Sequence, residues 1–582
     1  MRRTKIVCTI GPASESPEAV AALIEAGMDV ARLNLSHGES EEHWRRLQTI
    51  SEVCRQLNKV VAILVDTRGP EVRIGQLGDE GYLLEKGSDL ILTTAAMKGS
   101  QKKVPVNYPG LPQDLAPGRR ILIDDGLITL QVEAIEGEEI CCRVLQGGPL
   151  KSNKGLNLPG SGIGLPTLGE ADRADLKKAL SLGIHYIAVS FTRNRNDILE
   201  LRRFLEEERG EAKIIAKIED DSGLANFKQI LKIADGIMVA RGDLGVEIPE
   251  EEVPLLQKRI IRQCNHAGKP VITATQMLES MIDHPRPTRA EASDVANAIF
   301  DGTDAVMLSG ETAVGGYPVE TVQTMARIAR RTEEALNFEN MLADAEKHVE
   351  KNVTDAISYA TCHTAQELGA AAIITPTESG QTARMVSKYR PRAPIIAVTP
   401  GYAVAAQLKL IWGVLPVLCP PAGSTDEMFH NATHTAQQAG LIRDGELVVF
   451  TAGVPVGVSG TTNLLRVETV GEIIVQGTGI GKGAIFGRAA VITKASELAA
   501  VQEGEIIVTR ATDSSYLPAL EKAAAVVTEE GGLTSHGAIM ALHLDKPAIV
   551  GAGKATRLIS SGDPITVDSV RGLVYRGEAA IF

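Results

Sequence analysis

Short runs of apolar residues alternate with amphipathic helical patterns through the first part of the chain. The helix expected after the first run has a start signal at Ser16 and Pro17 and a stop signal at Gly27. Eight strands that alternate with helices predict an α/β fold in which a parallel sheet closes into a (β/α)8, or TIM, barrel. The runs are Lys5–Ile10, Val30–Leu35, Val60–Val65, Tyr186–Phe191, Lys213–Ile218, Gly236–Ala240, Pro270–Ala274 and Ala305–Leu308.

The stretch between the third and fourth runs is too long for a loop. About 120 residues separate Val65 from Tyr186, and glycines and prolines interrupt them. The apolar runs within this stretch are typical of antiparallel strands. We therefore expect an inserted, β-barrel-like domain, because the two ends of a barrel loop lie close together. The runs are Leu90–Thr93, Arg120–Ile123, Ile128–Ala134 and Ile140–Val144.

Two further α/β regions follow the predicted barrel. The chain becomes charged over 340–351, as in a linker, and a doubly wound pattern begins after it. A glycine-rich segment, Gly477–Gly487, opens a last region that ends in a predicted hairpin within Ile565–Tyr575. The strands expected are Ala371–Thr375, Pro394–Thr399, Val414–Leu418 and Leu447–Ala452, then Ala489–Ile492, Glu505–Val508, Ala524–Thr528 and Pro547–Val550. The predicted boundaries are 1–67 with 168–340 for the barrel, 68–167 for the insertion, 350–472 for the first α/β region and 475–582 for the last.

The composition is that of an ordinary soluble globular protein. The 582 residues are 44% hydrophobic and 23% charged, a length that suits about four domains. No apolar run is long enough to span a membrane, and the first residues do not resemble a signal peptide. Seven cysteines without metal-binding spacing indicate reduced thiols and a cytoplasmic location. The net charge of −13 and the 3% aromatic content argue against nucleic-acid and membrane partners.

Polar side chains gather where six of the eight predicted strands end. In a barrel enzyme the carboxyl ends of the strands form the active site, so these groups are expected to share one mouth. Alternation along the second strand places Arg32, Asn34 and Ser36 on one face. The six strand ends are Arg32–Gly38, Asp66–Thr67, Lys217–Glu219, Arg241–Asp243, Thr273–Gln276 and Ser309–Thr312.

The residue types at this mouth indicate the chemistry. Glu219 and Asp243 offer two hard oxygen ligands of the kind that Mg²⁺ prefers. Arg32, Arg73 and Lys217 offer positive charge for phosphate. Together they favour phosphoryl transfer by positioning and charge neutralisation. Further oxygen donors suit a second cation: Asn34, Ser36, Asp66 and Thr67.

Each of these residues also has a structural interpretation. Arg32 is compatible with a surface ion pair, Asp66 with a helix cap, and Lys217 and Glu219 with pairing to each other. His37 is compatible with a structural or peripheral role. We favour the functional interpretation because the polar groups coincide at successive strand ends.

Several longer motifs resemble the pyruvate kinase family. The resemblance extends from residue 3 to about residue 470. It implies a barrel with an inserted lid, an α/β regulatory domain and a homotetramer. It also implies transfer of the phosphoryl group of phosphoenolpyruvate to ADP, giving pyruvate and ATP, as in the final step of glycolysis. The motifs are Lys5–Pro12, Asn34–Gly38, Asp66–Arg73, Ala274–Met281, Pro285–Glu291 and Met307–Thr312.

The resemblance further implies roles for single residues. Arg32, Lys217 and a potassium ion hold the substrate phosphate. The substrate carboxylate lies on the backbone N–H groups of Gly242 and Asp243 and on the hydroxyl of Thr275, which also lies on the proton's route to the enol carbon. The nucleotide is expected at Asn34, His37, Arg73 and Lys154.

The ion sites follow from the same resemblance. Mg²⁺ or Mn²⁺ is expected on Glu219 and Asp243. Potassium-dependent members of the family carry a glutamate where Glu71 stands, so we expect a requirement for K⁺. The implied potassium ligands are Asn34, Ser36, Asp66 and Thr67.

The loop after the strand Ala371–Thr375 contains several hydroxyl groups before a predicted helix. Hydroxyl and N–H groups at a helix start can cradle phosphate, although an ordinary Ser/Thr cap has the same pattern. The resemblance implies an effector site here, which Gly457–Asn463 could complete. Glu378 is negative and Gln381 is no cation, so a sugar monophosphate or AMP is favoured over fructose 1,6-bisphosphate. The expected contacts are Thr377, Ser379, Gly380 and Thr382.

The last region resembles a different family. Glu529–Ile539 is similar to the swivelling phosphohistidine domain of phosphoenolpyruvate-utilising enzymes, with His536 at the position of the phosphoryl carrier. No ATP-grasp module is found in the chain to exchange phosphate with it, so a vestigial role for His536 is favoured. Two alternatives stay open, a phosphotransferase that works through His536 and a catalytically silent sensor. The helix Val253–Ala267 is compatible with a core or an interface position.

Overall fold

The computed structural model describes residues 1–70, 72–78, 80–124, 126–160, 164–454 and 462–579. All eight predicted runs form strands of one closed parallel barrel, so the predicted (β/α)8 architecture is confirmed. The strands follow one another around the barrel in the order β1-β17-β16-β15-β14-β13-β3-β2. Their bounds are β1 (Lys5–Thr9), β2 (Val30–Asn34), β3 (Ala62–Asp66), β13 (Tyr186–Val189), β14 (Lys213–Ile218), β15 (Gly236–Ala240), β16 (Val271–Ala274) and β17 (Ala305–Leu308).

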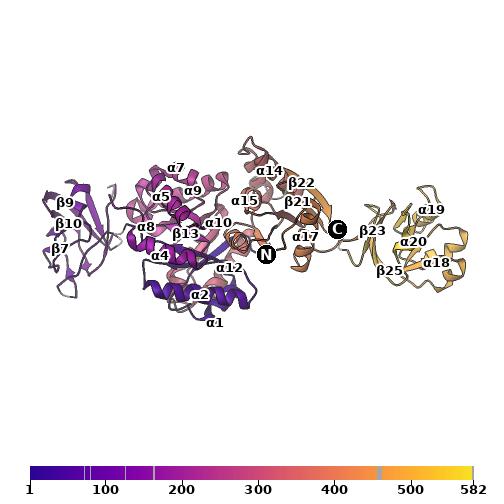
Figure 1. Cartoon of the computed structure of the whole chain (residues 1–582), viewed down its shortest axis with the longest axis horizontal. Helices are drawn as coiled ribbons and strands as arrows, with labels where there is room; N and C mark the ends of the chain where they lie inside the picture. The colour runs from indigo at the N-terminus through magenta and orange to yellow at the C-terminus, as the bar shows by residue number, and fades with distance from the viewer. Residues whose placement is uncertain (71, 79, 125, 161–163, 455–461, 580–582) are drawn as a thin grey trace. The chain divides into compact units, whose positions relative to one another are not determined.

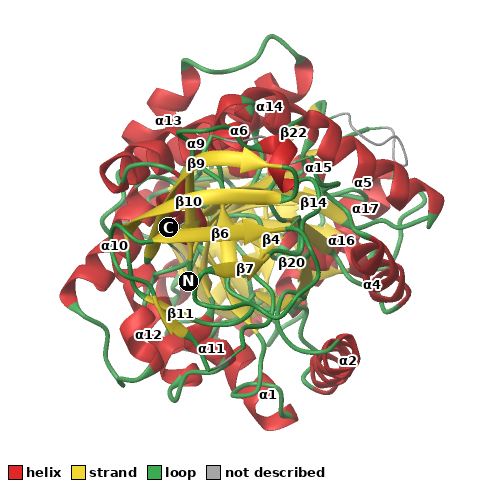
Figure 2. Ribbon diagram, turned by 90° about the vertical axis from the view of Figure 1, so that its left-hand side faces the viewer, coloured by secondary structure: helices red, strands yellow, loops and turns green. Residues whose placement is uncertain are grey.

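In Figure 2 the helices α1, α2, α4 and α10 lie around the outside of the strands. The first, α1 (Pro17–Ala26), begins at Ser16, whose side chain accepts from the backbone of Ala19, and ends at Gly27 with φ of 127°, as the sequence predicts. Ile260, Ile261 and Cys264 of α9 are buried in the barrel core, so this face of the helix is not an open interface. The other helices are α2 (Ser40–Gln56), α4 (Glu170–Ser181), α5 (Arg195–Glu207), α6 (Asp221–Ala225), α7 (Phe227–Ile233), α8 (Arg241–Glu247), α9 (Val253–Ala267), α10 (Arg289–Phe300), α11 (Gly310–Ala313) and α12 (Pro318–Glu333).

The insertion after β3 is a β domain with its own apolar core, which includes Leu90, Leu92 and Ile121. Its seven-stranded sheet has the order β4-β12-β8-β9-β10-β6-β7. The four predicted runs, β6, β8, β9 and β10, pair antiparallel as expected. The short strand β7 was not predicted, and it runs parallel to β6. The strands are β4 (Val72–Arg73), β6 (Asp89–Thr93), β7 (Lys103–Pro105), β8 (Arg120–Ile123), β9 (Ile128–Glu136), β10 (Glu139–Gln146) and β12 (Gly155–Asn157), and β5 (Tyr82–Leu83) pairs separately with β11 (Pro149–Leu150).

The charged segment after the barrel is not an extended linker. Helix α13 (Phe338–Glu346) occupies most of it, with Asn337 as its N-cap. The chain divides into two compact units at this point. One contains Met1–His348, Ala383–Arg390 and Gly401–Pro416, and the other contains Val349–Thr382, Pro391–Pro400 and Val417–Phe582.

The first α/β region has a five-stranded sheet in the order β20-β19-β18-β21-β22. The four predicted strands are present. The fifth, β22 (Leu464–Thr469), is antiparallel to β21 and was not predicted, because its polar residues interrupt the apolar pattern. The other strands are β18 (Ala372–Pro376), β19 (Ile395–Thr399), β20 (Val414–Leu418) and β21 (Leu447–Ala452), and the helices are α14 (Val353–Glu367), α15 (Gln381–Lys388), α16 (Tyr402–Leu408) and α17 (Thr425–Gln438).

The last region, yellow in Figure 1, has an eight-stranded sheet in the order β23-β30-β29-β25-β26-β27-β28-β24. The predicted hairpin is present as the antiparallel pair β29 and β30. No helix among the described residues is long and apolar enough to cross a membrane. The elements are β23 (Ile473–Gln476), β24 (Thr478–Ile480), β25 (Ala484–Ile492), β26 (Ile506–Thr509), β27 (Ala525–Thr528), β28 (Ala548–Val550), β29 (Pro564–Asp568), β30 (Leu573–Arg576), α18 (Leu517–Lys522), α19 (His536–His543) and α20 (Ala555–Leu558).

Candidate active site

Four charged side chains form a continuous chain of ion pairs at the barrel mouth. Asp66, fully buried at the end of β3, accepts from Nε and Nη2 of Arg32 at 2.9 and 2.7 Å. Its other oxygen lies 3.2 Å from Nζ of Lys217. Lys217 in turn lies 2.8 Å from Oε1 of Glu219. The structure thus brings together charges from three strands, and the pairing of Lys217 with Glu219 anticipated from the sequence is present within the cluster.

The cluster and its burial shift the pKa values of Asp66, Lys217 and Glu219. Burial alone would raise the pKa of Asp66, but Lys217 and Arg32 outweigh burial and hold it below its usual range. Burial lowers the pKa of Lys217, yet Asp66 and Glu219 outweigh that effect and raise it, so the ammonium stays charged. Burial, assisted by Asp243, raises the pKa of Glu219 to about 7 against the opposing charge of Lys217. Glu219 is therefore the carboxylate whose negative charge is least compensated.

Glu219 and Asp243 fit a divalent cation. Oε2 of Glu219 accepts from the backbone of Phe191, whose φ of 49° aims its N–H at the carboxylate. Asp243 lies in the first turn of α8 and repels Glu219 electrostatically. Among the described residues, no group of three His, Cys, Asp or Glu side chains is placed to hold a metal alone. A pair of carboxylates suits Mg²⁺, which takes its other ligands from substrate and water.

The four residues expected to hold a second cation lie at the adjacent ends of β2 and β3. Asn34 is in register with Asp66. The side-chain oxygen of Asn34 accepts from the backbone of Ser36 at 3.3 Å. Thr67 is buried, and its hydroxyl accepts from the backbone of Ser190 at 3.2 Å. Glu71, on which the sequence-based expectation of a potassium requirement rests, lies outside the described residues.

Thr275, at the end of β16, is held in a strained conformation. Its φ is +63°, in the left-handed region, and that of Gln276 is +54°. Arg241 fixes this turn by donating to the carbonyl of Thr275 at 2.6 Å and pairing with Asp294 at 2.7 Å. The Thr275 hydroxyl accepts from the backbone N–H of Gly242 at 2.8 Å. The predicted carboxylate-binding groups are thus in direct contact.

The sequence argument missed Ser190. Lys217 donates to its hydroxyl at 2.8 Å, and this hydroxyl donates to the carbonyl of Thr67 at 2.7 Å. Ser190 follows β13, the fourth barrel strand along the chain. The sequence signal that could have found it is a small polar residue inside the apolar run Tyr186–Phe191.

Conversely, two of the polar residues predicted at strand ends have structural roles. Glu311 accepts from the backbone of Ser309 at 2.7 Å, and Thr312 donates to the carbonyl of Thr9 at 2.8 Å.

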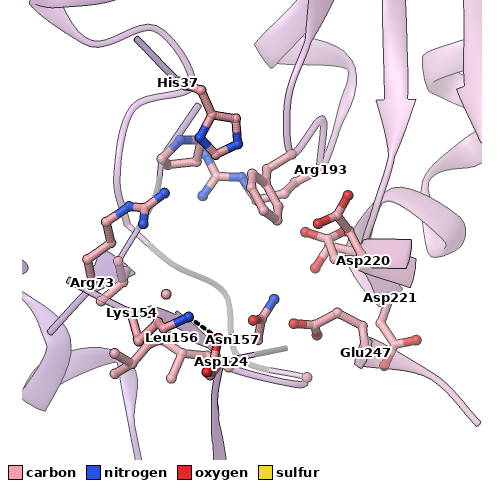
Figure 3. A pocket seen from close by; sticks show the side chains of 18 residues that line it. His37, Arg73, Asp124, Lys154, Leu156, Asn157, Arg193, Asp220, Asp221 and Glu247 are labelled. Carbon is pink, nitrogen blue, oxygen red and sulfur yellow. Dashed lines mark hydrogen bonds and ion pairs between the residues drawn. The ribbon is translucent and has the colours of Figure 1, made fainter. Parts of the chain in front are cut away.

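A cavity of about 410 Å³ is lined by residues of the barrel and of the inserted domain. Three of the four predicted nucleotide contacts line it, namely His37, Arg73 and Lys154, while Asn34 is not among the lining residues described. Lys154 pairs with Asp124 at 2.7 Å. Figure 3 shows His37, Arg73 and Arg193 opposite an acidic wall. That wall consists of Asp220, Asp221, Asp243 and Glu247.

The predicted effector loop lies between β18 and α15. The hydroxyl of Thr377 accepts from the backbone of Gly380 at 2.9 Å, so the loop folds back on itself. Thr382 is buried, and its hydroxyl lies 3.0 Å from that of Thr462. Of the second loop, 457–463, only Thr462 and Asn463 belong to the described residues.

His536 is the first residue of α19 and follows the N-cap Ser535. Its Nδ1 lies 3.1 Å from the hydroxyl of Thr512. The sequence motif therefore places a half-buried imidazole at a helix start.

The fold and this mouth define a barrel enzyme that handles an anionic, phosphorylated substrate. Family models match residues 1–322 as the pyruvate kinase barrel domain, 355–468 as the pyruvate kinase alpha/beta domain and 501–572 as the mobile domain of PEP-utilising enzymes. Pyruvate kinases from Geobacillus stearothermophilus and Bacillus licheniformis are 53% and 52% identical over 100% of both chains. The crystal structure of a pyruvate kinase from Cryptosporidium parvum matches with a TM-score of 0.77 at 40% identity, over 81% of this chain and 96% of that one.

The chain therefore belongs to the pyruvate kinase family and carries an additional PEP-utilising domain. As a member of this family it is a kinase whose substrates are phosphoenolpyruvate and ADP. The resemblance inferred from the sequence motifs is confirmed.

Proposed function

We propose that the ion-paired cluster Arg32–Asp66–Lys217–Glu219 binds phosphoenolpyruvate and neutralises charge during phosphoryl transfer to ADP. The observation that supports this is the burial of Lys217 between two carboxylates, which keeps its ammonium charged at the strand ends. Charges fixed in advance in a buried site stabilise a developing anion without reorganising at the moment of reaction.

The reaction then has two steps. The bond between the enol oxygen and phosphorus breaks, and a terminal oxygen of ADP bonds to the phosphorus in line. Arg32 and Lys217 neutralise charge on the moving phosphoryl group, and Lys217 also faces the enolate oxygen that keeps the electron pair. A proton then reaches the enolate carbon through water and the Thr275 hydroxyl, giving pyruvate.

The substrate carboxylate is held by the backbone N–H groups of Gly242 and Asp243 together with Thr275. The Gly242 N–H donates to the Thr275 hydroxyl, so two of the three proposed carboxylate-binding groups lie side by side. The strained turn at Thr275 holds this hydroxyl in one orientation, which supports its proposed role in delivering the proton.

The ions of this family complete the charge balance. Glu219 and Asp243 would hold Mg²⁺ or Mn²⁺, and K⁺ would lie at Asn34, Ser36, Asp66 and Thr67. When bound, these cations supply positive charge beside the phosphate. His37, Arg73 and Lys154, with Asn34 nearby, would contact the nucleotide, and the inserted domain would close as a lid that excludes water.

The test follows the phosphoryl group. We expect label from phosphoenolpyruvate to appear in ATP and none on the protein, because the sequence predicts no ATP-grasp module that would exchange phosphate with His536. The His536→Ala variant, or a chain without 475–582, should transfer phosphate at nearly the native rate. Base-stable, acid-labile label that is lost in His536→Ala would instead support the phosphotransferase alternative. A chain that turns over no phosphoenolpyruvate with ADP would support the silent sensor.

A phosphorylated effector is proposed for the loop before α15. Thr377, Ser379, Gly380 and Thr382 offer hydroxyl and N–H groups, and the exposed Glu378 disfavours a bisphosphate, so we favour a sugar monophosphate or AMP. A homotetramer and a cytoplasmic location also remain predictions.

Replacing Ser379 with Glu should abolish activation by these effectors, because the new carboxylate repels phosphate. Turnover at saturating substrate should stay native, and Ser379→Ala should lose only part of the response. Linkage requires that substrate tighten effector binding by the same factor as effector tightens substrate. Initial rates titrated with ribose 5-phosphate and AMP measure this, and undiminished activation of Ser379→Glu would reject the site.

A further inference from the structure

The barrel and the inserted domain face each other at the far end of α8. Asn157, the last residue of β12, comes three positions after Lys154 and lines the cavity. Glu247, the last residue of α8, lines the same cavity from the barrel side. In Figure 3 the Glu247 carboxyl group points toward the Asn157 amide. The strand that directly follows Lys154 and the helix that carries Gly242 and Asp243 are therefore opposed at their ends.

The surroundings of Glu247 make Asn157 its natural partner. Burial, followed by the charge of Asp220, raises the pKa of Glu247 to about 7, whereas the Asn157 amide stabilises the charged form. Asp221 and Asp243 add further negative charge from the same wall. The preceding residue, Val246, lies 3.9 Å from the position that a side chain at Gly126 of the inserted domain would take. The facing pair thus adjoins a second place where the barrel and the inserted domain come close together.

We propose that Asn157 and Glu247 form a catch that holds the inserted domain closed over the nucleotide. Both are positioning residues. Asn157 fixes the strand that directly follows Lys154, and Glu247 fixes the end of the helix that carries Gly242 and Asp243. A primary amide can donate to a carboxylate without adding charge to an already acidic wall. The inference rests on the proposed placement of the nucleotide in this cavity.

The decisive experiment exchanges the two partners. Asn157→Asp places two carboxylates face to face, so we expect the catch to open and the KM for ADP to rise about tenfold. The KM for phosphoenolpyruvate should change less than twofold, because the ion-paired cluster is untouched. Adding Glu247→Gln to Asn157→Asp restores one amide and one carboxylate in swapped positions. This double variant should return to within about twofold of the native KM for ADP.

Two controls separate the catch from a general charge effect. Gln131→Glu adds the same charge to β9, outside the residues that line the cavity, and should leave both KM values unchanged. Hydrogen exchange at residues 155–157 should speed up in Asn157→Asp and slow again in the double variant. The proposed catch is wrong if the double variant restores neither the KM for ADP nor the slow hydrogen exchange at 155–157. It is also wrong if Asn157→Asp raises the KM values for ADP and for phosphoenolpyruvate together.

The failure of the proposed nucleotide site would look different. Lys154→Met should raise the KM for ADP if the cavity takes the nucleotide. An unchanged KM in Lys154→Met would remove the nucleotide from this cavity. Hydrogen exchange would in that case still decide whether Asn157 and Glu247 join the two domains.

Discussion

Lys217→Met is expected to lower kcat by about 10²–10³ while the protein stays folded. The substitution keeps the length of the side chain and removes the charge that lies 3.2 Å from Asp66 and 2.8 Å from Glu219. In the proposed mechanism, both the transferring phosphoryl group and the enolate would lose a fixed positive charge. The measurement is the steady-state rate of pyruvate formation with Mg²⁺ and K⁺ at saturating substrates.

Lys213→Met is the matched control for this prediction. Lys213 begins the same strand, β14, at the end away from the mouth, and is only partly buried. Its replacement should leave kcat unchanged. Because Lys217→Met also leaves two buried carboxylates without a partner, thermal unfolding of each variant must be recorded, and Lys217→Arg keeps a charge at the site. A folded Lys217→Met enzyme with native kcat would remove Lys217 from the mechanism.

Withdrawal of K⁺ is expected to reduce activity about tenfold or more, in Na⁺ or tetramethylammonium buffer of equal ionic strength. Asn34, Ser36 and Thr67 offer neutral oxygen ligands for the cation, and the negative charge of Asp66 is already paired with Arg32 and Lys217. These side chains supply no positive charge of their own that would replace a bound cation beside the phosphate. Adding K⁺ back should restore the rate.

The potassium experiment needs one check on the assay itself. When pyruvate formation is followed by a coupled reaction that consumes pyruvate, pyruvate added directly must be consumed at the same rate in all three buffers. This check shows that the coupled reaction itself does not depend on the cation. Equal turnover in K⁺, Na⁺ and tetramethylammonium would contradict the second cation site and leave the role of Lys217 untouched.

The sequence by itself determined the elements whose signals are local. Three features were predictable: the eight barrel strands, the caps Ser16 and Gly27 of α1, and the bounds of α9. Each depends on the periodicity of hydrophobic residues or on capping residues within a single segment. The long family motifs likewise identified the class of enzyme. The residues of the charged cluster were nominated for the same reason, because each stands within the last part of an apolar run or directly after it.

The tertiary structure decided what depends on segments distant in the chain. The parallel pairing of β6 with β7, the helix α13 in a charged segment and the antiparallel β22 depend on neighbours that no local pattern specifies. Ser190 was missed because its role exists only through Lys217 and Thr67, which come from other strands. The positive φ of Thr275 is likewise held from outside, by Arg241. The periodicity of hydrophobic residues fixes which segments form strands, but the ion pairs and the strained turn arise only when the barrel brings its strand ends to one mouth.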